Sequence, residues 1–133
     1  MSKILFIKES NFKTTAYYED KEENVYSLNS FLNDLAHKYF FTISIYKKMI
    51  RKYLPLKNKI PIYFSDKILL FYLLDNLGNR YLINYNSLAK ICYDNEVLFL
   101  FKNGYILSCD VNKKIINNEL KKVYSILEYM HNK

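Results

Sequence analysis

The chain has 133 residues, half of them hydrophobic, and only two are glycine and two are proline. This length suits a single domain with a sizeable core, and the composition excludes a disordered or low-complexity chain. The formal net charge of +7 favours an anionic partner. The longest apolar run, residues 68–74, is too short to cross a bilayer. We therefore expect one domain over residues 1–133, without a membrane span.

The polar chemistry of the chain is sparse. Cys92 and Cys109 belong to a chain long enough to fold without disulfides, so free thiols in a reducing cytosol are expected. The apolar patch at residues 4–7 has no cleavage-site pattern after it, which favours a cytoplasmic protein. His37 and His131 lack metal-ligand spacing, and no phosphate loop, paired-cysteine motif or nucleophile elbow is present. The sequence thus predicts no enzyme, no cofactor and no metal.

The first half of the chain alternates strand and helix signals. Strands are predicted at residues 3–8 and 12–18, followed by a charged loop at residues 19–24. A helix then begins, capped by Ser27 or Asn29, with an apolar spacing of three and four at Leu28, Phe31, Leu32 and Leu35.

The next segment leads into a second helix. Residues 39–43 suit either a short strand or the start of this helix. The helix is predicted at residues 44–54, with Ser44 as its cap, and it ends before Pro55.

The second half of the chain is predicted to form a meander closed by a helix. Further strands are predicted at residues 60–64, 68–74, 80–85 and 88–93. Asn112 caps a final helix at residues 113–131, whose apolar stripe is expected to cover the sheet. The predicted fold is α+β: an antiparallel β-meander sheet, a basic helix in the first half, and a C-terminal amphipathic helix packed on the sheet.

The clearest local signal is Asn103-Gly104, which lies between β-rich runs at residues 96–102 and 105–111. Asn and Gly tolerate φ > 0, so a two-residue type I′ turn is expected. This turn fixes a register in which Leu100 faces Leu107. The register predicts three buried leucines: Leu98, Leu100 and Leu107.

Nearly all of the excess charge lies in one segment. Residues 41–60 carry a net charge of +6 and no acid, whereas residues 1–40 carry −1 and residues 61–133 carry +2. On a helix the first four cations share a face and repel one another. Either they bind phosphate or they form a solvated face beside a basic loop. The six cations are Lys47, Lys48, Arg51, Lys52, Lys57 and Lys59.

Short motifs follow one another in a distinctive order over roughly residues 9–130. Upstream, they comprise Phe40-Phe41, Ser44, Tyr46 and Arg51. Within the meander they comprise Lys59–Ile62, Ile68–Phe71, Tyr81–Asn86, Val97–Phe101, Asn103-Gly104 and Ile106–Ser108, followed by the closing helix. Their order and spacing resemble the ComK family of bacterial competence transcription factors. Leu82 stands where the family has Trp, and the chain lacks the family's longer C-terminal tail.

This resemblance implies an activator of transcription in Gram-positive bacteria of low G+C content. It would recognise paired A/T-rich boxes of double-stranded DNA, largely through the minor groove, under the control of an adaptor and a protease. Lys and Arg bind phosphates without reading sequence, whereas Arg, Asn and Gln read the minor groove. Arg80, Asn84 and Asn86 therefore join the six cations as candidate DNA-binding residues, although the two asparagines also fit ordinary turn positions.

Two other functions fit the same features. A pleckstrin-homology-type interaction module also combines a meander with one closing helix, and its basic patch would bind acidic headgroups. The other candidate is a small inhibitor that occupies a nucleic-acid-binding host protein. The sequence leaves open whether the chain acts on DNA as a homo-oligomer.

Overall fold

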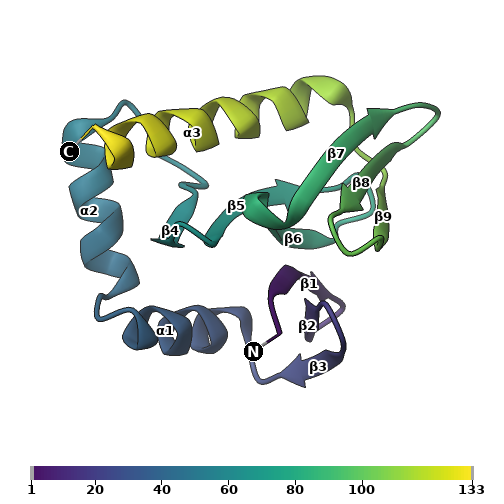
Figure 1. The fold of residues 1–133 in the computed structure, drawn as a ribbon, viewed down its shortest axis with the longest axis horizontal. Coiled ribbons are helices and arrows are strands. Elements are labelled where there is room, and N and C mark those ends of the chain that lie inside the picture. Colours follow the sequence, from purple (N-terminus) through teal and green to yellow (C-terminus); the bar gives the residue numbers. More distant parts are fainter. Residues whose placement is uncertain (1, 133) are drawn as a thin grey trace.

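The computed structural model describes residues 2–132, and it is α+β, with two antiparallel sheets and three α-helices (Figure 1). The larger sheet has the strand order β3-β2-β1-β6-β5-β4, and the smaller has the order β7-β8-β9. The helices are α1 (Leu28–Lys38), α2 (Ile43–Tyr53) and α3 (Lys113–His131). The strands are β1 (Ile4–Ser10), β2 (Lys13–Tyr18), β3 (Glu22–Val25), β4 (Ile62–Ser65), β5 (Ile68–Leu74), β6 (Arg80–Asn84), β7 (Leu88–Tyr93), β8 (Val97–Phe101) and β9 (Ile106–Cys109).

The meander predicted for the second half is interrupted after β6. The N-terminal strand β1 pairs with the free edge of β6, placing Phe6 opposite Ile83. A 3₁₀ turn, η1 (Tyr85–Ser87), then carries the chain out of the first sheet and into the second. The predicted α+β fold with an antiparallel sheet and a closing helix is confirmed. Only the continuation of the meander through residues 88–93 was wrong, because β1 takes the position that β7 would have occupied.

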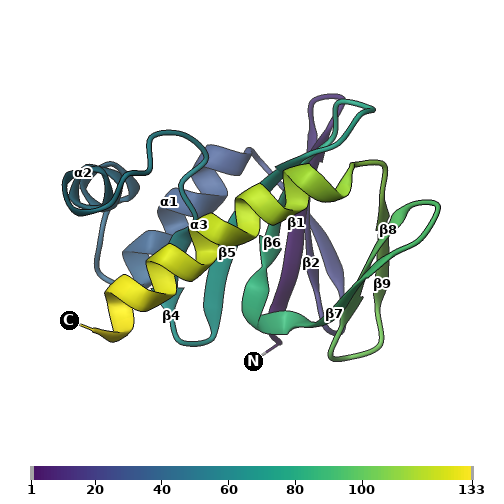
Figure 2. The same ribbon diagram turned by 90° about the horizontal axis from the view of Figure 1, so that it is seen from above.

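Aromatic side chains join the two sheets. Phe6 stacks on Tyr17 of the neighbouring strand with ring centroids 4.4 Å apart, and its ring lies 5.6 Å from that of Phe101 in β8. Phe6 and Phe101 are both buried, so the space between the sheets belongs to the core. Helix α3 crosses β5 on one side of the larger sheet (Figure 2), and α1 lies on the other side (Figure 1).

The helices begin where side-chain caps place them. Ser27 Oγ accepts a hydrogen bond from Ser30 N (3.0 Å), and Asn112 Oδ1 accepts one from Ile115 N (3.0 Å). Ser27 is thus the cap of α1, of the two residues expected, and the predicted start of α3 is confirmed. Helix α2 begins one residue earlier than expected, because Thr42 is its cap and Ser44 is not. The charged segment at residues 19–24, predicted as a loop, includes the start of the exposed edge strand β3.

The hairpin between β8 and β9 turns over three residues, Lys102, Asn103 and Gly104, and not over two. Gly104 N donates to Phe101 O (2.9 Å), and Phe101 N donates to Tyr105 O (2.9 Å). Within this turn only Gly104 has a positive φ, of 95°. Asn103 acts through its side chain, since its Oδ1 accepts from Tyr105 N (3.1 Å).

The extra turn residue shifts the register by one and exchanges the faces of β8. Phe99 opposes Leu107, and Leu98 opposes Ser108. Phe99 is fully buried, whereas Leu98 and Leu100 are only half-buried. Two of the three predicted core leucines were therefore wrong, and Leu107 was right.

Both cysteine thiols are free. Burial, with a smaller contribution from Asp75, raises the pKa of the Cys109 thiol to about 12, so this group stays protonated at neutral pH. Among residues 2–132, no helix combines the length and the apolar character that crossing a bilayer requires.

The observed register predicts that Phe99→Ala lowers the free energy of unfolding by about 3–5 kcal/mol, because it leaves a cavity between the sheets. The matched change Leu100→Ala should cost clearly less, since Leu100 is partly exposed. Urea denaturation of both variants measures the difference. A larger loss for Leu100→Ala would contradict the observed register and support a two-residue turn.

Candidate nucleic-acid interface

Helix α2 docks on the edge strand β4 through its apolar face. Tyr46 and Ile50 are buried there. The Tyr46 hydroxyl donates to Pro61 O (2.7 Å) and accepts from Tyr63 N (3.1 Å), so it covers the backbone at this edge. Burial raises the pKa of Tyr46, which keeps the hydroxyl protonated and able to donate. The opposite face of α2 is thereby turned to solvent.

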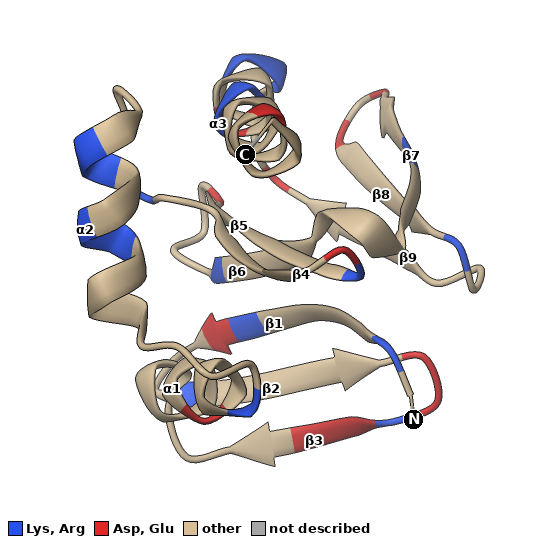
Figure 3. Cartoon of the chain, turned by 60° about the vertical axis from the view of Figure 1, so that its left-hand side comes forward, with Lys and Arg blue, Asp and Glu red and all other residues tan. Residues whose placement is uncertain are grey.

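That outer face is basic. Lys48, Arg51 and Lys52 are exposed, and Figure 3 shows the basic positions of α2 along its length. Arg51 Nε donates to Lys57 O (3.3 Å), which ties the helix to the loop that follows. Lys57 is exposed in that loop and extends the same surface. We call these four residues the basic face.

Helix α3 supports the loop beside the basic face. Lys122 Nζ donates to Asn58 O (3.0 Å), and it pairs with Glu119 Oε1 at 3.2 Å. The side chain of Glu119 is only 8% exposed, so this ion pair is shielded from solvent and keeps Lys122 in position. No local sequence pattern predicts this contact, because it joins residues 64 positions apart.

Four of the thirteen acidic residues gather at the other end of the larger sheet. The connection between β2 and β3 contains Glu19 and Asp20, and β3 begins with Glu22 and Glu23. Strand β3 is one edge of the sheet, and β4, against which α2 docks, is the other edge. The molecule is therefore polarised, and an approaching polyanion is attracted to α2 and repelled from β3.

Three further predicted residues lie apart from the basic face and surround a cleft. Lys47 of α2, Lys59 of the loop and Arg80 of β6 line a cavity of about 290 Å³, together with Tyr72 and neighbouring apolar residues. Lys47 is half-buried, and its Nζ lies 5.8 Å from the centroid of the Tyr72 ring. Burial, and secondarily the charge of Arg51, lowers the pKa of Lys47.

Asn84 does not belong to the interface. Its side chain is fully buried; Oδ1 accepts from Leu69 N (3.1 Å), and Nδ2 donates to Ile4 O (2.9 Å) and to Ser87 Oγ (3.0 Å). It is thus a structural residue, and its selection as a DNA-binding residue was wrong. Asn86 is half-buried near α3, in the wall of a different groove, and lies apart from α2.

Among residues 2–132, no cluster of His, Cys, Asp and Glu has the arrangement of a metal site. Comparisons of the chain with protein-family models, curated proteins and solved structures find no match.

The buried amide generates a prediction about stability. Asn84→Ala should lower the free energy of unfolding by about 1–3 kcal/mol, because it leaves the buried Leu69 N–H without its partner. Asn86→Ala is the matched control and should cost less. Chemical denaturation compares the two, and a negligible loss for Asn84→Ala would contradict the structural role of this residue.

Proposed function

We propose that the protein is a cytoplasmic, DNA-binding regulator of transcription that holds duplex phosphates with the basic face of α2. The single observation that carries this proposal is that Lys48, Arg51, Lys52 and Lys57 are all exposed on one side, in a segment without any acid. Such a cluster of like charges is unfavourable by itself and becomes favourable against a polyanion.

The preference for A/T-rich duplexes is the finer part of the proposal. It is supported by the ComK-like order of motifs and by Arg51, whose exposed side chain is held at the centre of the basic face by its bond to Lys57 O. The minor groove of A/T-rich DNA is narrow and has a strongly negative potential, which attracts an inserted arginine.

Salt dependence tests the phosphate contacts. Four to six contacts give a slope of roughly −4 to −5 for log K against log salt. Lys48→Ala combined with Lys52→Ala should weaken binding to every duplex alike and make the slope shallower by nearly two units, since phosphate contacts do not read sequence. Fluorescence anisotropy over a salt series measures both quantities.

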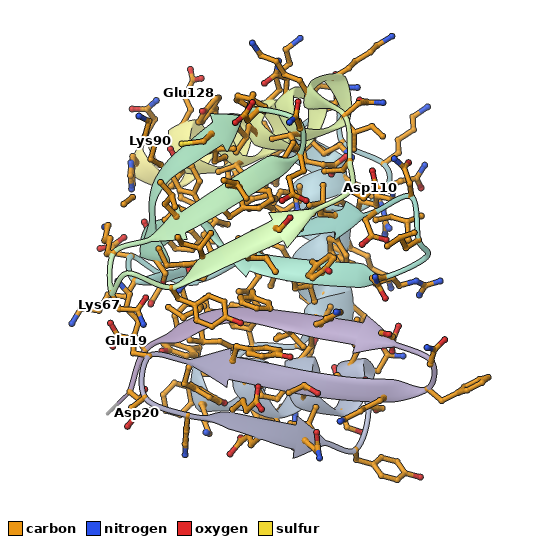
Figure 4. The ribbon with its side chains drawn as sticks, turned by 90° about the vertical axis from the view of Figure 1, so that its right-hand side faces the viewer. Glu19, Asp20, Lys67, Lys90, Asp110 and Glu128 are labelled. Atoms are coloured by element: carbon orange, nitrogen blue, oxygen red, sulfur yellow. The ribbon has the colours of Figure 1, made fainter. Side chains whose placement is uncertain are left out.

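The matched control removes two lysines from the side away from α2. Figure 4 views that side and labels Lys90 of β7, which is exposed, as is Lys102 in the turn between β8 and β9. Lys90→Ala combined with Lys102→Ala changes the net charge equally and should leave the slope almost unchanged. An equal effect of both pairs, or no binding of any duplex at about 50 mM salt, would overturn the proposal.

Arg51 generates a separate prediction about sequence preference. Arg51→Ala should reduce the ratio of affinities for matched A/T-rich and G/C-rich duplexes, whereas Lys48→Ala should leave this ratio unchanged. Arg51→Lys retains the charge but loses the planar guanidinium group, so it should preserve the salt slope and still lower the preference. Competition by a minor-groove ligand gives an independent reading, and a preference that survives Arg51→Ala contradicts this role.

A second candidate is an interaction module for anionic membrane surfaces. Ile45 is 67% exposed and lies three and seven residues before Lys48 and Lys52, so all three share the outer side of α2. Phe40, at the start of this region, is 96% exposed. Apolar side chains among cations suit a membrane with acidic headgroups. Sedimentation with vesicles containing phosphatidylserine, without binding to any duplex, would favour this candidate.

A further inference from the structure

The cleft beside α2 differs from the basic face in shape and in surroundings. It is formed by α2, the loop before β4, and strands β5 and β6, and its volume of about 290 Å³ suits a small molecule and excludes a duplex. Three cations reach it from segments that are distant in the chain: Lys47, Lys59 and Arg80. Among the described residues that line the cleft there is no carboxylate.

Lys47 is the cation with the most unusual environment. It is half-buried, and no ion pair joins it to a carboxylate among residues 2–132. A partly desolvated ammonium group without a counter-ion is unfavourable, and its lowered pKa reflects this. An anion in the cleft would supply the missing charge.

Arg80 and Lys59 are the other two cations that line the cleft. The Arg80 side chain is 69% exposed, and its Nη1 lies 3.7 Å from Glu9 Oε1, which is longer than a hydrogen bond. Its guanidinium group can therefore offer paired donors to a phosphate. Lys59 has a φ of 50°, a conformation that residues other than glycine seldom adopt, and such strain is often found at binding sites.

The remaining walls are aromatic and apolar. Tyr72 and Tyr81 line the cleft, and so does Leu28, the first residue of α1. Burial raises the pKa of both tyrosines, so their rings are neutral at physiological pH. A site that combines three cations with neutral rings and apolar side chains matches a ligand with a charged head and an apolar or aromatic body.

We propose that this cleft binds a small, freely diffusing phosphomonoester, with its phosphate held by Lys47, Lys59 and Arg80 and its body against Tyr72 and Leu28. Binding of this ligand does not depend on the proposed function. The consequence of binding does rest on the proposed function. A phosphate dianion in the cleft reduces the positive potential next to the basic face and so weakens DNA binding.

Phenyl phosphate is the probe for the test, and phenol and inorganic phosphate are its controls. Two-dimensional NMR of the full chain should show saturable shifts for residues around the cleft with phenyl phosphate. Phenol should give none, and inorganic phosphate should bind more weakly. Affinity should fall as the pH is lowered through about 6, because the phosphate then loses its second charge.

Two substitutions one position apart separate the cleft from general electrostatic attraction. Lys47→Met retains the aliphatic stem and should weaken phenyl phosphate binding at least about tenfold, as expected when a charge-assisted hydrogen bond is lost. Lys48→Met removes the same charge from the exposed basic face and should have little effect. Equal loss in both variants, or shifts that do not saturate, would overturn the proposal.

Two further arms identify the source of the phosphate and the link to DNA. Binding to vesicles that contain phosphatidic acid, without binding of phenyl phosphate, would overturn the proposal of a free ligand. In the presence of a duplex, phenyl phosphate should lower DNA affinity in the wild-type protein and not in Lys47→Met. Because the NMR titration is made without DNA, it measures ligand binding in the cleft even if the protein binds no duplex.

Discussion

The side-chain amide of Asn84 joins segments that are far apart in the chain. It lies at the end of β6 and holds the carbonyl of Ile4 in β1, the N–H of Leu69 in β5, and the hydroxyl of Ser87 at the start of the second sheet. All of these groups are removed from solvent, where an unpaired polar group is costly. One residue thus ties β1, β5 and η1 to the end of β6 and adds to the four-residue pairing of β1 with β6.

The position of α2 follows from this arrangement. With β1 on one side of β6, the strands β5 and β4 extend to the other, and β4 becomes the edge that receives Tyr46. Docking of Tyr46 and Ile50 fixes which side of α2 is buried. The basic face and the cleft are therefore two sides of one helix: Lys48 points outward, whereas the adjacent Lys47 is half-buried against the sheet.

Local signals in the sequence were sufficient for most of the elements, with β3 missed, and insufficient for their assembly. The bounds of α3 and the strand at residues 88–93 were predicted correctly, and Ser27 was one of the two caps expected for α1, because capping and periodicity act over a few residues. Asn103-Gly104 indicated the hairpin but not its register, since the same dipeptide also fits a three-residue turn with glycine last. The burial of Asn84 and the presence of Lys47 and Arg80 in one cleft arise from contacts between distant segments, which no local pattern encodes.

The place of β1 in the larger sheet also sets the order in which the chain can fold. Its apolar residues Ile4 to Ile7 are buried, yet the partner strand β6 is made only after residue 80 has been added. At a synthesis rate of about 5–20 residues per second, the hairpin of β1 and β2 has one unpaired edge for on the order of ten seconds before β6 is complete. Such long-range pairing is slow and leaves apolar edges open to other chains. Expression at lower temperature, or together with a chaperone, should therefore raise the yield of folded protein.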